Sequence, residues 1–126
     1  MNPIALDSSS LIAFLNGRVS SDTTSVRDAL AAGNAVVPPL VVTEVLSLPG
    51  LSDEVTTFVR GLVQLPTATG YWERAGHLRA SVIASGRRAR MADTLIAQSC
   101  IDHDVPLVSA DADFRHFVAH GLRLID

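Results

Sequence analysis

Four acidic residues stand in or beside apolar segments of the 126-residue sequence, where an ionised carboxylate is costly unless it is paired or bound to a cation. They are Asp7, Glu44, Asp93 and Asp111. Grouped carboxylates repel one another and take up protons unless a cation neutralises them, and Mg²⁺ or Mn²⁺ prefers such oxygen ligands. Ions of this kind can activate water for the displacement of a phosphate ester. The residues therefore predict metal-assisted phosphoryl hydrolysis.

Short apolar strands that alternate with helices must position these acids. Apolar runs predict buried strands over 3–6, 35–37, 105–108 and 122–125. Helical spacing predicts helices over 11–15, 40–48, 52–63, 71–84 and 92–101, a further one capped by Thr23 or Thr24, and a loop or helix over 111–120. Parallel strands are buried on both faces and need crossover helices, so the pattern predicts an α/β sandwich with a central parallel sheet.

In such a sheet, ligands bind beyond the carboxyl ends of the strands. Asp7 and Asp111 each follow a predicted strand, and Glu44 and Asp93 would join them from helices. The four acids are thereby expected at one site.

Two helices carry more detailed signals. Ser52 precedes two acidic residues and is expected to cap the helix over 52–63. In the segment 71–84, the apolar face is predicted from the spacing of four residues: Trp72, Ala75, Leu78 and Val82.

Composition excludes several classes of protein. A chain with 48% apolar and 18% charged residues is expected to fold, as one domain over 1–126. A single cysteine, Cys100, excludes an internal disulfide and a CxxC zinc site. All ten basic residues are arginine, which excludes a Walker A lysine and the lysine on which receiver domains and haloacid-dehalogenase phosphatases depend. Without a basic leader or a long apolar run, we expect a cytoplasmic protein with no membrane association.

Four ordered segments resemble the PIN-domain ribonucleases, and within them the VapC-type toxins of toxin–antitoxin pairs. The segments are LDSSSLIAFL at 6–15, PLVVTEVLSL at 39–48, MADTLIAQSC at 91–100 and PLVSADADF at 106–114. They follow the family's order and cover nearly the whole chain. The resemblance implies a single PIN-like α/β/α sandwich whose carboxylates hold Mg²⁺ or Mn²⁺ and hydrolyse RNA.

Carried over residue by residue, the resemblance identifies Asp7, Glu44 and Asp93 with the family's first three acids. The segment after 106 offers two carboxylates for the fourth place. We favour Asp111 as the fourth catalytic acid and keep Asp113 as a further candidate metal ligand.

The resemblance also gives roles to polar neighbours of the acids. Ser9 and Ser109 are expected to orient the acids through hydrogen bonds. Arg87, Arg88 and Arg90 could engage RNA phosphates, or form a solvated basic loop. Without the four predicted acids the formal net charge changes from −3 to +1, so the rest of the chain is not acidic.

The resemblance implies products with 5′-phosphate and 3′-hydroxyl ends, a homodimer, and a cognate antitoxin in an apolar groove around the helices at 40–63. Two alternatives stay open: a catalytically idle PIN-like interaction module and a metal-dependent phosphatase. The complete acidic set favours catalysis, because an idle site has no reason to keep mutually repelling charges.

Overall fold

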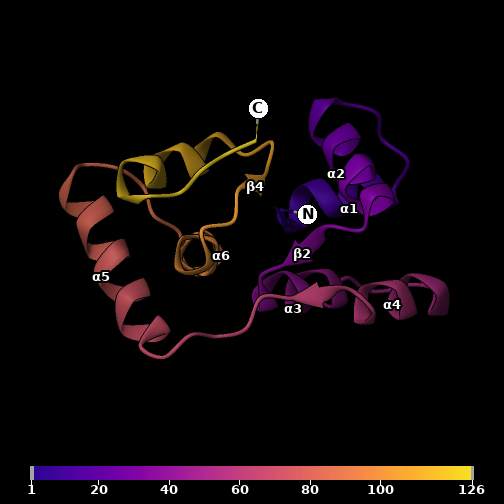
Figure 1. Ribbon diagram of the computed structural model, residues 1–126, viewed down its shortest axis with the longest axis horizontal. Helices are drawn as coiled ribbons and strands as arrows, with labels where there is room; N and C mark the ends of the chain where they lie inside the picture. Colours follow the sequence, from indigo (N-terminus) through magenta and orange to yellow (C-terminus); the bar gives the residue numbers. More distant parts are fainter. Residues whose placement is uncertain (1, 126) are drawn as a thin grey trace.

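A four-stranded parallel sheet forms the centre of the computed structural model, which describes residues 2–125 (Figure 1). The strand order is β3-β2-β1-β4. The bounds are β1 (Ile4–Leu6), β2 (Ala35–Val37), β3 (Val63–Gln64) and β4 (Leu107–Val108). The predicted α/β/α sandwich with a parallel sheet is confirmed.

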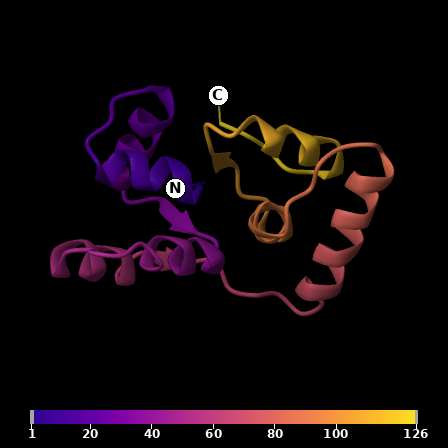
Figure 2. The same ribbon diagram turned by 180° about the vertical axis from the view of Figure 1, so that it is seen from behind.

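Helices connect the strands. They are α1 (Ser8–Leu15), α2 (Ser21–Ala32), α3 (Pro39–Leu46), α4 (Asp53–Arg60), α5 (Tyr71–Ala84), α6 (Met91–His103) and the 3₁₀-helix η1 (Ala112–His120). Seen from opposite sides, Figures 1 and 2 place α1 to α4 in one half of the molecule and α5, α6 and η1 in the other. None of the helices within residues 2–125 is both long and apolar enough to cross a bilayer.

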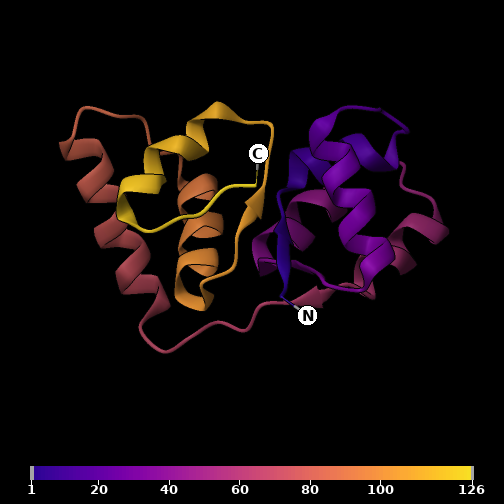
Figure 3. The same cartoon turned by 45° about the horizontal axis from the view of Figure 1, so that its top comes forward.

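The strand β1 joins the two halves, because it pairs with β2 on one side and with β4 on the other. Figure 3 shows β1 and β4 side by side at this junction. The register places Leu6 opposite Val108, and the Asp7 N–H donates to the Val108 carbonyl at 3.1 Å. Residues that follow β1 and β4 therefore meet at one edge of the sheet.

Apolar side chains from both halves fill the core around the sheet. The strands are short but almost wholly apolar, as expected for strands covered on both faces. Side chains with essentially no exposure come from strands, helices and η1: Leu6, Leu11, Val26, Val37, Val41, Ile96, Leu107, Phe114 and Phe117.

Helix caps account for two differences from the predicted bounds. Asp7 accepts a hydrogen bond from the Ser8 N–H, so α1 begins at Ser8 and not near 11. A capping box formed by Ser20 and Thr23 starts α2, which places Thr23 inside the helix and not at its cap. The cap predicted for α4 is confirmed, since Ser52 Oγ accepts from the Val55 N–H at 3.1 Å.

One packing prediction, that for Trp72, was wrong. Trp72 is 66% exposed, and Tyr71 takes the buried place on α5 beside Ala75, Leu78 and Val82. The positions 71, 75, 78 and 82 follow a helical repeat, whereas Trp72 is turned about 100° away from that face.

The segment predicted as a strand over 122–125 contributes only a single parallel bridge, between Leu124 and Leu107. The chain leaves η1 through Gly121 at a φ of 110° and passes β4 at one point. The strand predicted over 105–108 is present as β4, but it is only two residues long.

Candidate active site

Asp7 is the buried carboxylate of the site. It lies directly after β1, is 4% exposed and accepts three hydrogen bonds. The Ser8 N–H donates to Oδ1 at 2.8 Å, and the hydroxyls of Ser9 and Ser109 donate to Oδ2 at 2.7 and 2.8 Å. Burial raises the pKa of Asp7, and the three hydrogen bonds oppose that effect only in part. The carboxyl group is therefore fixed in position by the first residues of α1 and by the loop that follows β4.

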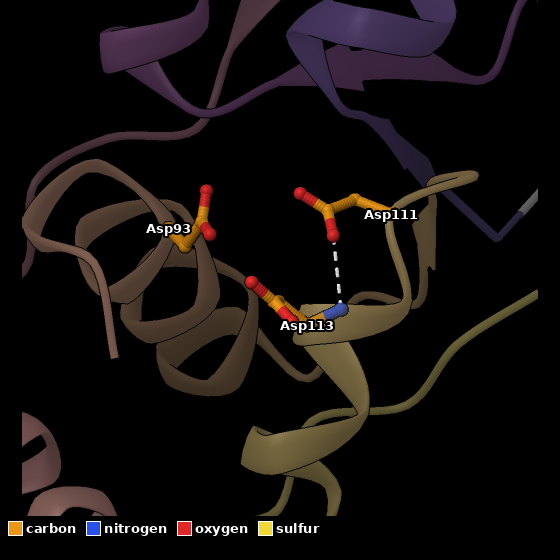
Figure 4. Close-up of side chains that lie close together, drawn as sticks. All are labelled: Asp93, Asp111 and Asp113. Carbon is orange, nitrogen blue, oxygen red and sulfur yellow. Dashed lines mark hydrogen bonds between the residues drawn. The ribbon is translucent and has the colours of Figure 1, made fainter. Parts of the chain in front are cut away.

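A chain of hydrogen bonds continues from Asp7 into the loop that follows β4. Ser109 Oγ, which donates to Asp7, also accepts from the Asp111 N–H at 3.0 Å. Asp111 is the N-cap of η1, and its Oδ1 accepts from the Asp113 N–H at 2.9 Å (Figure 4). This turn brings Asp111 and Asp113 to the same side of the loop.

Three carboxylates then converge on one space. Asp93, Asp111 and Asp113 each offer an oxygen, and these oxygens lie within 4.8 Å of one another. Figure 4 shows Asp93 reaching in from α6 and the two others from the loop and the start of η1. Within residues 2–125, these three carboxylates, the acidic trio, are the one group of three or more candidate metal ligands that lie this close together. Neither Asp7 nor Glu44 belongs to the group.

Asp93 carries the clearest sign of a missing partner. Its Oδ2 is buried and has no hydrogen-bond partner within residues 2–125. Burial raises the pKa of Asp93 to about 6, and the charges of Asp111 and Asp7 add to the effect. A buried oxygen without a donor, among further carboxylates, fits a hard divalent cation, because such a cation neutralises the group and takes oxygen ligands.

Glu44 enters from α3 through a different contact. Its Oε1 accepts from the Ser8 hydroxyl at 2.9 Å, while the Ser8 N–H donates to Asp7. Ser8 thus bridges two acids that stand 37 positions apart in the chain. The sequence analysis missed this role, although Ser8 lies between two residues that it did single out.

We expect Ser8→Ala to weaken Mn²⁺ binding by about tenfold, because groups that orient metal ligands typically contribute 10- to 100-fold to affinity. Glu44 is only half-buried, so stability without metal should change by less than about 1 kcal/mol. Calorimetric titration with Mn²⁺ measures the affinity. Ser47→Ala is the matched control, since Ser47 is the C-cap of α3 and its hydroxyl donates to the Thr43 carbonyl, not to an acidic side chain. Equal affinities in the two variants would contradict this role.

The basic residues predicted beside the site lie in the turn between α5 and α6. Arg87, Arg88 and Arg90 are all exposed. Arg88 Nη1 is 3.9 Å from Asp113 Oδ2, and the charge of Arg90 partly opposes the rise in the pKa of Asp93. The turn therefore lies next to the acidic trio, although its role in binding stays a prediction.

The family model of the PIN domain matches residues 4–119. The chain belongs to the PIN domain family. No curated protein matches the sequence.

Solved structures share the fold of this PIN domain at low sequence identity. VapBC2 from Rickettsia felis bound to a DNA fragment matches with a TM-score of 0.71 and 19% identity, over 97% of this chain and 96% of that chain. DNA-bound VapBC from Salmonella typhimurium gives 0.70 and 20%, over 100% and 98%. FitAcB from Neisseria gonorrhoeae gives 0.69 and 14%, over 98% and 96%. These likenesses support the fold, and the roles of individual side chains stay predictions.

Proposed function

We propose that this PIN domain is a VapC-type toxin that hydrolyses RNA with Mg²⁺ or Mn²⁺. The observation that carries the proposal is the unpartnered Asp93 oxygen inside the acidic trio. Membership of the PIN domain family supports a nuclease, and the fold shared with VapBC and FitAcB supports a toxin.

In this proposal Asp93, Asp111 and Asp113 hold the cation directly. Asp7 and Glu44 complete the acidic site from the side of β1 and α3, joined through Ser8. A divalent cation bound there supplies activation of water and neutralises charge on the phosphodiester. The spacing of the trio supports direct contact by Asp113 as well as Asp111.

The serines around Asp7 keep its carboxylate from turning. Ser9 and Ser109 both donate to Oδ2, which leaves the second oxygen, Oδ1, with the Ser8 N–H. A carboxylate held in this way needs no reorganisation when RNA binds, which favours catalysis. Arg87, Arg88 and Arg90 would attract phosphates to the same face, since guanidinium groups suit phosphate oxygens.

The partner in this proposal is an antitoxin protein. VapBC and FitAcB are toxin–antitoxin complexes, and they share the fold. Exposed apolar side chains occur around the helices at 40–63, where we propose that the antitoxin binds: Leu46, Leu48 and Val63. We also propose that the toxin is a homodimer.

Cleavage of a total-RNA pool tests the function. The purified protein, freed of any partner that co-purifies, is incubated with Mg²⁺, Mn²⁺ or EDTA. We expect discrete fragments with 5′-phosphate and 3′-hydroxyl ends in either metal and none in EDTA. Hydrolysis of a small phosphomonoester with intact RNA would instead indicate a phosphatase. Metal binding without turnover of either substrate would indicate an interaction module.

A further inference from the structure

A hollow of about 310 Å³ opens beside the acidic trio. Asp111 lines both, so the hollow continues directly from the candidate metal site. The first turns of α2 form the opposite wall, and Arg115 of η1 is also part of the lining. The polar residues of the lining are Ser21, Asp22, Ser25, Ser109, Asp111 and Arg115.

Arg115 gives this hollow a cation without an assigned partner. Its side chain is exposed, and it makes no hydrogen bond or ion pair with any group in the described part of the chain. By contrast, Arg74 and Arg123 are engaged by Asp102 and Asp104. A guanidinium group presents five donors in a planar fork that matches phosphate oxygens. An arginine that has no partner within residues 2–125, in a hollow beside the proposed phosphodiester site, therefore points to a second phosphate.

Asp22 supplies an acceptor on the opposite wall. Its two oxygens accept from the hydroxyls of Ser20 and Ser10, the latter at 2.9 Å, and these bonds keep its pKa below the usual range. The carboxylate is therefore ionised, fixed and still able to accept from a hydroxyl donor. Ser21 and Ser25 add hydroxyls that can donate or accept. Such a wall suits the sugar of a ribonucleotide, whose 2′-hydroxyl distinguishes RNA from DNA.

We propose that this hollow binds the nucleotide next to the scissile phosphate of RNA. Arg115 pairs with the phosphate of that nucleotide, and Asp22 accepts from its ribose hydroxyl. The volume lies at the lower end of the range for small-molecule sites, which suits one nucleotide. The inference rests on the proposed ribonuclease function, because it assigns the hollow to the same RNA chain.

Two measurements on Arg115→Gln test the assignment. Backbone amide NMR follows uridine 5′-monophosphate and its 2′-deoxy form without metal. We expect shifts at Ser21, Ser25 and Ala112, weaker binding of the deoxy form, and affinity lowered about tenfold by Arg115→Gln. In RNA cleavage, the variant should raise KM about tenfold and change kcat little, since Arg115 does not touch the reacting atoms. Arg60→Gln is the matched control, because Arg60 is an exposed arginine on α4, outside this hollow.

The outcomes separate this inference from the proposed function. Equal nucleotide binding by Arg115→Gln and Arg60→Gln, or shifts confined to other amides, would overturn the hollow as a nucleotide site. If Arg115→Gln weakens nucleotide binding but cleaves RNA as the wild type does, the hollow does not bind the RNA substrate. That result would indicate a site for a free nucleotide. Nucleotide binding through Arg115 in a protein that cleaves no RNA would overturn the ribonuclease function instead.

Discussion

Asp93→Asn should reduce metal-dependent RNA cleavage by at least about 100-fold, because it removes a charged oxygen from the centre of the acidic trio. The same change should stabilise the protein in the absence of metal. Neutral asparagine relieves the repulsion from Asp111 and Asp7 and the burial of a charge. Loss of activity together with a gain in stability is the expected signature of a site built to hold a cation.

The raised pKa of Asp93 determines the pH range in which Asp93→Asn is more stable than the wild type. The pKa of Asp93 is raised from 3.8 to about 6 in the folded protein, so folding favours its protonated form. The contribution of protonated Asp93 to the free energy of unfolding is fully present below pH 3.8 and is lost as the pH rises through about 6. Above that pH, Asp93→Asn should be more stable than the wild type. Because solvent screens part of the shift, we expect a gain of about 1 to 2 kcal/mol.

Thermal unfolding at pH 5 and pH 8, with EDTA or Mn²⁺, measures both effects. Mn²⁺ should raise the Tm of the wild type and leave that of Asp93→Asn nearly unchanged, since ligands stabilise only the state that they bind. Asp28→Asn serves as the control, because Asp28 is an exposed acid paired only with Arg27. An Asp93→Asn protein that keeps both cleavage and the Mn²⁺ effect would refute the assigned role.

Asp7→Ala should destabilise the fold by about 2 to 3 kcal/mol. The change leaves the partly buried Ser8 N–H and Ser109 hydroxyl without their acceptor, and a buried unsatisfied group costs about 1 to 3 kcal/mol, less where water can reach it. Ser9 is exposed and can turn to water, so it adds little. The raised pKa of Asp7 means that its ionisation opposes folding as the pH rises. The loss of stability should therefore be larger at pH 5 than at pH 8.

Urea unfolding of Asp7→Ala and Asp7→Asn tests this prediction. Asparagine keeps one acceptor oxygen and the shape of the side chain, so Asp7→Asn should lose less than half as much stability while losing RNA cleavage. If Asp7→Ala unfolds at the same urea concentration as the wild type, the hydrogen bonds that Asp7 accepts do not stabilise the fold as we expect.

The elements that depend on local signals could be predicted from the sequence. The helix over 71–84 has the predicted bounds, and the strand over 35–37 matches as well. Both are defined by their own residues: a helical apolar repeat in one, and an apolar run closed by prolines in the other. The segment over 122–125 also carries an apolar pattern, but whether it pairs depends on the distant position of β4, which no local signal encodes.

The same distinction applies to the candidate site. The types and order of the acids singled out Asp7, Glu44, Asp93 and Asp111, and the structure places them around one edge of the sheet. Asp113 is held beside Asp111 by hydrogen bonds that link Ser109, Asp111 and Asp113. These bonds form only when the loop has folded. The bridge from Ser8 to Glu44 joins two helices that the sequence cannot orient relative to each other.

The hydrogen bond from Ser109 to Asp7 spans 102 positions of the chain. A ribosome synthesises Asp7 102 residues before Ser109, and Asp111 and Asp113 follow Ser109 in the chain. Until they are synthesised, the nascent chain lacks two members of the acidic trio and the hydroxyl that holds Asp7 in place. Chains that end before residue 109 should therefore bind no divalent cation at this site, because the site forms only after β4 and the loop that follows it have been synthesised.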